Sequence, residues 1–287
     1  GIGSPRASVE SNYLLQKLVG PSNFSAGLSH KEQTILKRQV SILQTTKAHN
    51  PSVKDIETAD AILVLGEDLT NTAARIALAI RQATKNKAIA MARQMGIEEW
   101  QDGAVKNLAQ EERSPLFIAT PASTKLDDIA LETMTLPPEE IANFGLKLAR
   151  HLTEGDSQDS QIIKIATHLS TAERPLIISG PSLLNANIVE SAAAVAEALV
   201  TINQNTQLSF TSPESNSTGS ILLSEDRNLT LQEVIKGINE IDVLIVLEND
   251  LSRRLSAFEM TQINASSAKI ISIDILENET LEMSDMV

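Results

Sequence analysis

The chain has 287 residues, enough for one large domain or two ordinary ones, and its 42% apolar and 21% charged residues are typical of a globular protein. Aromatic residues make up only 2%, so the core must be aliphatic, which suits helices packed on a parallel sheet. The net charge of −13 argues against binding nucleic acid or anionic lipid, because both attract basic surfaces. We interpret the acidity as a contribution to solubility.

The sequence contains no cysteine, which excludes disulfides, thiolate metal sites and iron–sulfur ligation within this segment. Its four histidines are scattered and lack the spacing of a metal site. No apolar run is long enough to span a membrane, and no signal peptide is visible. The first and last residues resemble the interior of a longer protein, so we expect the sequence to be a fragment.

The clearest predicted strand is the continuous apolar run 61–65, as expected for a strand covered on both faces. Gly66 ends this run, and the threonines at 70 and 72 are suitable helix N-caps. Apolar residues then recur at helical spacing over 76–83. The segment therefore predicts a strand, a turn and a helix.

Further strands and helices are predicted along the rest of the chain. We expect strands at 115–119, 175–179, 243–247 and 269–273, and helices at 137–152, 162–169, 188–200 and 231–238. Their alternation indicates an α/β fold with mostly parallel sheets. Residues 201–220, which are polar over their second half, predict a flexible loop.

Two distant segments resemble each other. Residues 58–69 and 240–251 both contain an apolar strand preceded by an aspartate and followed by an acidic turn. Asp60, Leu65 and Asp68 correspond, at a constant offset, to Asp242, Leu247 and Asp250. Any two buried strands share some similarity, but the matching acidic turns favour two related Rossmann-like lobes.

Three pieces of the sequence resemble the molybdopterin oxidoreductase family. Segment 3–17 resembles the family's G-S-x-R turn followed by a helix with an N-Y-L-x-Q-K run, and segments 59–66 and 243–249 resemble its two equivalent strands. The resemblance implies two Rossmann-like αβα lobes. It places residues 25–204 in one lobe, and residues 1–24 together with 205–287 in a second, discontinuous lobe.

Other segments resemble one branch of that family more closely, namely the large iron–sulfur subunit of NADH–quinone oxidoreductase, the bacterial respiratory complex I. The matching segments are 66–70, 74–83, 124–130 and 247–251. The resemblance implies a fragment of a peripheral-arm subunit, on the cytoplasmic side of the bacterial inner membrane, with the other peripheral-arm subunits as partners. It also implies that the 4Fe-4S and 2Fe-2S clusters belong to an N-terminal region outside this sequence, so that no cofactor is expected here.

The sequence departs from the molybdenum enzymes where their anionic pterin cofactor would lie. The family has a G-x-N-P-type turn after the first strand and D-P-R after the next. Here Glu67 and Asp68 occupy the first turn, and Thr120 begins a turn without arginine. Carboxylates facing a pyrophosphate would repel it, and burying them unpaired is costly. We therefore expect an empty, vestigial cleft without catalytic residues, lined by Gly66, Glu67, Asp68, Thr120, Glu248, Asn249 and Asp250.

The acidic turns admit two interpretations. Asp68 and Asp250 could cap the helices that follow them or pair with Arg75, Arg253 or Arg254. Alternatively, Glu67, Asp68, Glu248 and Asp250 together could hold Ca²⁺ or Mg²⁺. Capping is the more ordinary explanation and needs no metal.

Two hypotheses of different classes follow. In the first, the chain is a non-redox scaffold within complex I, the complex that passes electrons from NADH to quinone. In the second, it is a domain that retains a molybdopterin or nucleotide cofactor. Extraction of the purified protein for fluorescent pterins would distinguish them.

Overall fold

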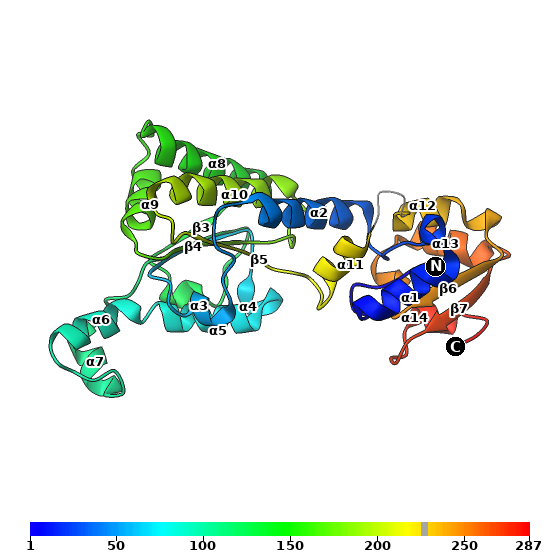
Figure 1. Cartoon of the computed structure of the whole chain (residues 1–287), viewed down its shortest axis with the longest axis horizontal. Coiled ribbons are helices and arrows are strands. Elements are labelled where there is room, and N and C mark those ends of the chain that lie inside the picture. The colour runs from blue at the N-terminus through cyan, green and yellow to red at the C-terminus, as the bar shows by residue number, and fades with distance from the viewer. Residues whose placement is uncertain (225–228) are drawn as a thin grey trace. The chain divides into compact units, whose positions relative to one another are not determined.

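The computed structural model describes residues 1–224 and 229–287, which form two compact units (Figure 1). The split unit comprises Gly1–Val40 and Ser212–Val287, and the continuous unit comprises Ser41–Thr211. The sequence-based division places the boundaries after residues 24 and 204, whereas the structure places the first inside helix α2 (His30–Thr45) and the second after Thr211. At the first boundary, the difference arises because the α2 residue Leu36 packs with Phe24 and Leu28 in the core of the split unit.

The continuous unit is built on a five-stranded parallel sheet. Its strands are β1 (Ala61–Leu65), β2 (Leu116–Thr120), β3 (Glu132–Thr135), β4 (Pro175–Ser179) and β5 (Gln207–Phe210). They lie in the order β3-β2-β1-β4-β5. In the middle of the sheet, Leu63 pairs with Phe117 on one side and Ile177 on the other. Strands β1, β2 and β4 are buried at every position, as their unbroken apolar sequences predict.

The helices of the continuous unit are α3 (Val53–Ile56), α4 (Leu69–Thr72), α5 (Ala74–Ala83), α6 (Asn86–Gln94), α7 (Asp102–Ala109), α8 (Pro138–Glu154), α9 (Ser160–Thr171) and α10 (Ala186–Ile202), with the 3₁₀ turn η2 (Asp127–Ile129). Helices α6 and α7 pack on each other and extend away from the sheet (Figure 1). Helices α3 and α5 lie on one face, and α8, α9 and α10 lie on the other (Figure 1). Because α10 packs on α8 as well as on β4, its alanine-rich sequence is buried on more than one side.

The split unit has a smaller parallel sheet. Its elements are α1 (Val9–Val19), η1 (Pro21–Asn23), α11 (Ser217–Leu223), α12 (Leu231–Lys236), η3 (Ile238–Glu240), β6 (Val243–Leu247), η4 (Leu251–Arg253), α13 (Ala257–Ala265), β7 (Lys269–Ile273) and α14 (Glu279–Glu282), together with the first part of α2. Strands β6 and β7 pair over their whole length.

Single-residue parallel bridges widen this two-stranded sheet. Ile2 joins Val246 of β6 on one side and Ser25 on the other, and Ser25 joins Leu229. At the opposite edge, Met286 joins β7. Across the unit, the order is therefore Leu229, Ser25, Ile2, β6, β7 and Met286. When the first five are numbered by their order along the chain, they read 3-2-1-4-5, which is also the strand order of the continuous unit.

This shared order refines the internal similarity seen in the sequence. The similar segments contain β1 and β6, but Ile2 is the member of the split unit that occupies the position of β1. Strand β6 occupies the position of β4. The two sheets therefore have the same strand order, but the two segments that are similar in sequence occupy different positions in them.

The predicted α/β class with mostly parallel sheets is confirmed, and all five predicted strands are present. Sequence analysis missed β3 and β5, which form the two edges of their sheet and carry polar residues. The prediction of a loop over 201–220 was wrong, because this range contains β5 and the start of α11. The backbone of β5 is drawn into regular structure by pairing with β4, which local composition does not reveal.

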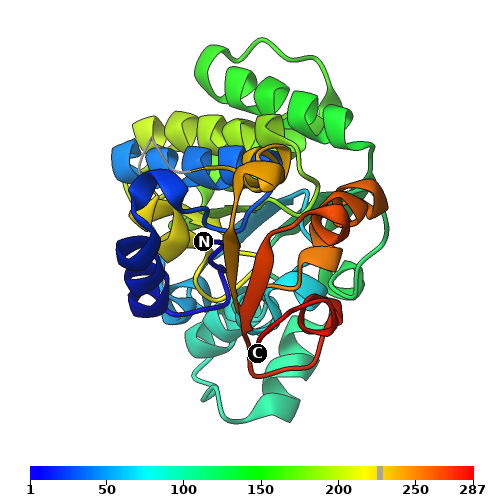
Figure 2. The same ribbon diagram turned by 90° about the vertical axis from the view of Figure 1, so that its right-hand side faces the viewer.

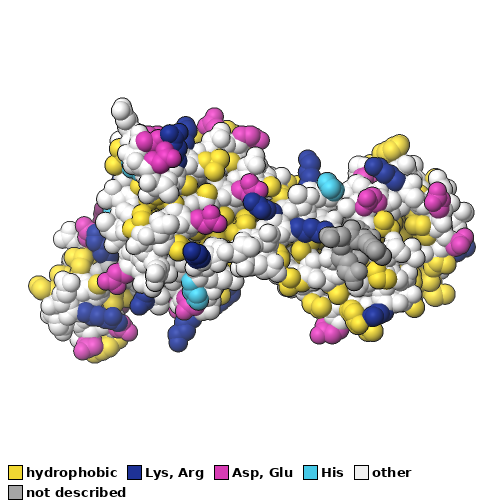
Figure 3. Space-filling model, turned by 45° about the horizontal axis from the view of Figure 1, so that its top comes forward, with side chains coloured by type: hydrophobic (Ala, Val, Ile, Leu, Met, Phe, Trp, Pro, Cys, Tyr) yellow, Lys and Arg dark blue, Asp and Glu magenta, His cyan; other side chains and the backbone are white. Residues whose placement is uncertain are grey.

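Within the described ranges, no helix is long and apolar enough to cross a membrane. Acidic and basic side chains are interspersed over the faces visible in Figure 3.

Candidate functional site

In the continuous unit, the sheet order reverses between β1 and β4, because β2 lies on one side of β1 and β4 on the other. Doubly wound sheets usually bind ligands at such a switch point, in the crevice outside the carboxyl ends of the two strands. Here the turns that meet are Gly66–Glu67 after β1 and Gly180–Ser182 after β4.

Glu67 crosses this switch point. Its side chain is buried, with 1% of the residue exposed, and it accepts three hydrogen bonds. The backbone N–H of Ser182 donates to Oε1 at 2.9 Å, and the hydroxyl of Ser182 donates to Oε2 at 2.7 Å. The hydroxyl of Thr72 also donates to Oε2, at 3.0 Å. Glu67 therefore links the turn after β1 to the turn after β4. The two residues that donate to it, Thr72 and Ser182, are exposed.

Two glycines make this close approach possible. A Cβ atom on Gly180 would lie 1.9 Å from Thr211 Oγ1 and 2.5 Å from Glu67 Oε1. Gly66 has φ of +77°, a conformation that favours glycine, and its N–H donates to Ala119 O of β2 at 2.8 Å. The hydroxyl of Thr211 is buried without a hydrogen-bond partner among the described residues, and it lies against the backbone of Gly180.

Asp68 and Thr120, two other candidate residues, stabilise the turns in which they lie. Asp68 is the N-cap of α4, since its carboxylate accepts from Thr70 N at 3.2 Å and from Asn71 Nδ2 at 2.6 Å. The capping interpretation is therefore confirmed for Asp68. Thr120 ends β2 and donates its hydroxyl to Ala122 O at 2.8 Å, which closes the following turn.

In the split unit, the corresponding reversal lies between Ile2 and β6. Arg6, in the turn after Ile2, donates Nε and Nη2 to the carbonyl oxygen of Glu248 at 3.1 and 3.0 Å. Its Nη2 also pairs with the carboxylate of Asp274 at 3.1 Å. Glu248 has φ of +45°, which is strained for a residue with a side chain, and the two bonds to its carbonyl stabilise that conformation. Arg6 thus joins the turns after the strand at Ile2, β6 and β7.

A buried amide positions the turn that carries Arg6. Asn12 Oδ1 accepts from Ser4 N at 3.0 Å, and Asn12 Nδ2 donates to Ser4 O at 2.8 Å. The hydroxyl of Ser4 in turn accepts from Arg6 N at 3.1 Å. The family-like motif in segment 3–17 therefore has a structural explanation, because its asparagine in α1 holds the turn from which its arginine projects.

Asn249 and Arg254 form a second polar group in the split unit. Asn249 is buried, and its Nδ2 donates to the carbonyls of Gly3 and Gly27 at 2.7 and 3.1 Å. Its Oδ1 accepts from Arg254 Nε at 3.0 Å. Arg254 also pairs with Glu32, at 3.0 Å, and with Glu214.

These residues line a cavity of about 400 Å³, whose wall also includes Arg6, Pro213, Asp250 and Arg253. Asp250 caps η4, accepting from Ser252 N at 3.3 Å, so the capping interpretation is confirmed here too. The described residues contain no group of three or more histidine, cysteine, aspartate or glutamate side chains placed to hold a metal ion.

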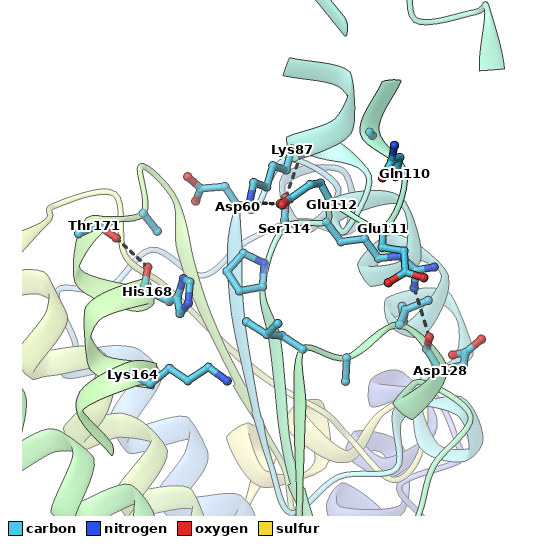
Figure 4. Close-up of a pocket in the computed structure, with 17 residues that line it drawn as sticks. Asp60, Lys87, Gln110, Glu111, Glu112, Ser114, Asp128, Lys164, His168 and Thr171 are labelled. Atoms are coloured by element: carbon cyan, nitrogen blue, oxygen red, sulfur yellow. Dashed lines mark hydrogen bonds and ion pairs between the residues drawn. The ribbon is translucent and has the colours of Figure 1, made fainter. Parts of the chain in front are cut away.

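A larger cavity, of about 1090 Å³, lies at the amino edge of the sheet in the continuous unit (Figure 4). Its walls come from α9, with Lys164 and His168, and from the segment after α7, with Glu112 and Arg113. The pKa of His168 is lowered, chiefly by burial and then by nearby lysines. Many charges of the wall are satisfied within the protein: Lys164 pairs with Glu132, and Lys87 pairs with Glu112.

Comparison with known proteins shows which proteins this chain resembles. It is 41% identical over its whole length to the G subunit of NADH-quinone oxidoreductase from Pseudomonas putida. It is 42% identical over 94% of its length to the G subunit of Pseudomonas fluorescens, and 38% identical over 99% to that of Escherichia coli K12. The chain is homologous to a segment of the NADH-quinone oxidoreductase G subunit. It spans about a third of these relatives, namely 31 to 33% of their length.

The fold is shared with a distant solved structure. A component of the formyltransferase/hydrolase complex of Methylorubrum extorquens, determined with methylofuran, superposes with a TM-score of 0.63 over all of this chain and 78% of its own. At 14% identity, this likeness supports the fold alone. No protein-family model matches the chain.

The structure assigns specific environments to the predicted site residues. Within the continuous unit, Glu67 lies at the switch point, with Gly66 before it and Asp68 capping the next helix. Within the split unit, Glu248, Asn249 and Asp250 follow β6. Sequence analysis missed Ser182 and Arg6 as their partners. It named Arg254 as a possible partner of Asp68 or Asp250, whereas the structure pairs it with Asn249, Glu32 and Glu214. Arg6 stands in the motif of segment 3–17 and Ser182 follows a predicted strand, so their positions, though not their contacts, were visible.

Proposed function

We propose that this chain is a non-redox scaffold within the G subunit of NADH-quinone oxidoreductase, respiratory complex I, and that its ligand crevices are vestigial. The contact between Glu67 and Ser182 carries this proposal. A buried carboxylate stands at the place where a doubly wound sheet would present N–H donors to an anionic group. An anionic pterin there would meet a like charge, and its entry would break three hydrogen bonds.

The split unit supports the same interpretation by a different contact. Arg6, whose guanidinium lies at its switch point, is already engaged with Glu248 O and Asp274. Arg254 is engaged with two carboxylates and an amide. The residues present therefore do not fit a pterin dinucleotide, and we derive no redox step for this chain.

By homology, the partners of the chain would be the other peripheral-arm subunits of complex I, on the cytoplasmic side of the bacterial inner membrane. The iron–sulfur clusters, 4Fe-4S and 2Fe-2S, would belong to a region of the subunit outside these residues. The whole enzyme would transfer electrons from NADH to quinone, and this chain would contribute structure.

One observation favours the alternative, a domain that retains an anionic cofactor or nucleotide. The cavity of about 400 Å³ in the split unit is lined by three arginines, Arg6, Arg253 and Arg254. Its volume is near the lower end of the range for small-molecule sites. Against this, Glu32, Glu214 and Asp250 line the same cavity and offset the positive charge.

Two measurements test the scaffold proposal. The purified full-length protein is denatured, and the supernatant is examined for oxidised pterin fluorescence and for nucleotides; neither is expected in stoichiometric amount. In the assembled enzyme, Glu67→Ala should lower the amount of complex recovered while the NADH:quinone rate per iron–sulfur cluster stays unchanged. A stoichiometric pterin or nucleotide, or a lower rate per cluster with normal assembly, would overturn the proposal.

A further inference from the structure

The two faces of the β6–β7 sheet are covered unequally. In a parallel pair, residues in register lie on the same face. One face therefore carries Leu244 with Ile270, and the opposite face carries Val243, Ile245 and their partners in β7. Figure 2 shows the two strands side by side, with helix α13 beside β7.

The first face is fully buried. Leu244 and Ile270 belong to a core cluster with residues from α12, η4 and α13, including Leu231, Leu251 and Ile263. Met283, directly after α14, packs against the same cluster. The connections that precede β6, that lead from β6 to β7 and that follow β7 thus all contribute to this one face.

The opposite face is covered only in part. Ile245 and Leu247 pack against the cluster that includes Leu15 of α1. Val243, by contrast, is 49% exposed and Ile273 is 54% exposed, and Ile271 between them is half-buried. Lys269, the register partner of Val243, is exposed on the same face and pairs with Asp285. We call Val243, Ile271 and Ile273 the open face.

An open face is unexpected for β6. Strand β6 reads Val-Leu-Ile-Val-Leu, a continuous apolar run of the kind found where both faces of a parallel sheet are buried. The topology explains the exposure. Successive right-handed crossovers in one direction place their helices on the same side of a sheet, so α13 and α14 cannot cover the other side. Among the described residues, α1, α2 and α11 supply helical cover on that side, through the cluster that contains Leu247 and contacts Ile245.

We propose that the open face is covered, in the whole subunit, by a segment of the same polypeptide that lies outside these 287 residues. The homologous subunits are about three times as long as the region they share with this chain, since the match spans 31 to 33% of their length. A covalently attached segment reaches such a face at high effective concentration. The proposal depends on the homology and the open face, and it is independent of whether the switch-point crevices bind a ligand.

Hydroxyl-radical footprinting of the full-length protein tests this proposal without mutation. Oxidation of Val243 and Ile273 is measured, divided by the intrinsic reactivity of each side chain, and compared with that of Phe258. Phe258 lies on α13 and is 73% exposed, which makes it a matched apolar control. We expect several-fold lower normalised oxidation at the open face than at Phe258. Equal oxidation in the full-length protein would overturn the proposal.

Photo-crosslinking identifies the occupant. A benzophenone amino acid replaces Ile273 in the full-length protein, and the same replacement at Phe258 serves as the control. We expect an intramolecular crosslink from position 273 to a peptide outside the present sequence. A crosslink to another subunit, or protection that appears only in the assembled enzyme, would contradict the proposal because the occupant would be a different polypeptide. A crosslink between two copies of the same polypeptide would contradict it as well.

Discussion

Replacing Glu67 by alanine should destabilise the continuous unit specifically. The carboxylate is 1% exposed and accepts three hydrogen bonds at 2.7 to 3.0 Å, from Ser182 and Thr72. Hydrogen bonds to charged groups contribute roughly 1.5–3 kcal/mol each, but the exposed hydroxyls can bond to water after the change. We therefore expect Glu67→Ala to lower the free energy of unfolding by about 2–4 kcal/mol.

Glu67→Gln provides a graded comparison. Its Oε1 can still accept from Ser182 N, and its amide can donate to the Ser182 hydroxyl, so we expect a loss of only about 1 kcal/mol. Asp68→Asn is the matched control in the next position. Asparagine caps helices about as well as aspartate, so this variant should stay within about 0.5 kcal/mol of the unmodified protein.

Native-state hydrogen exchange of peptides from β1 and β4 measures the effect in the continuous unit alone. A loss of about 2–4 kcal/mol lowers the protection of these amides about 30- to 700-fold, since 1.4 kcal/mol corresponds to a factor of ten. Peptides from β6 and β7 provide an internal reference. Unchanged protection in Glu67→Ala, or equal losses for Glu67→Ala and Asp68→Asn, would refute the assignment of Glu67 as the link between β1 and β4.

Three further predictions concern other contacts. Gly180→Ala should destabilise the continuous unit by about 1–3 kcal/mol, because the added Cβ would overlap the side chains of Thr211 and Glu67. Gly103→Ala is the control: Gly103 has open space around it in α7, so this change should stabilise the helix by up to about 1 kcal/mol. Arg254→Met should cost the split unit about 3 kcal/mol by leaving two partly buried carboxylates unpaired, whereas the exposed Arg253→Met should change stability by about 0.5 kcal/mol or less. NMR titration of His168 should give a pKa below 6.5. Because the folded protein binds this proton more weakly than the unfolded protein, the free energy of unfolding should decrease as the pH falls from 6.5 towards the folded pKa.

A specific result would contradict each of these predictions. The glycine argument fails in urea unfolding if both alanine variants shift the midpoint in the same direction by the same amount. The Arg254 argument fails if both arginine variants unfold alike. For His168, the unfolded state binds more protons than the folded state between the two pKa values, so stability must rise with pH there. A His168→Gln variant that retains the same pH dependence over that interval would show that another group causes it.

Sequence alone determined the strands that lie inside the sheets. Strand β1 reads Ala-Ile-Leu-Val-Leu and β4 reads Pro-Leu-Ile-Ile-Ser, and their apolar side chains must leave water whatever surrounds them. The homology to the large iron–sulfur subunit of complex I was also readable from local motifs, because aligned residues need no knowledge of their contacts. Edge strands β3 and β5 escaped detection since their polar residues acquire strand conformation only by pairing with a neighbour.

Tertiary structure decided what the acidic turns do. Glu67 and Ser182 lie 115 positions apart, and Arg6 and Glu248 lie 242 positions apart, so no local pattern could pair them. Sequence analysis expected carboxylates that repel an anion from an empty cleft, but it could not foresee that Glu67 would be buried and fully engaged. The strand order brought these partners together, because the carboxyl ends of parallel strands meet at one edge however far apart they lie in the chain.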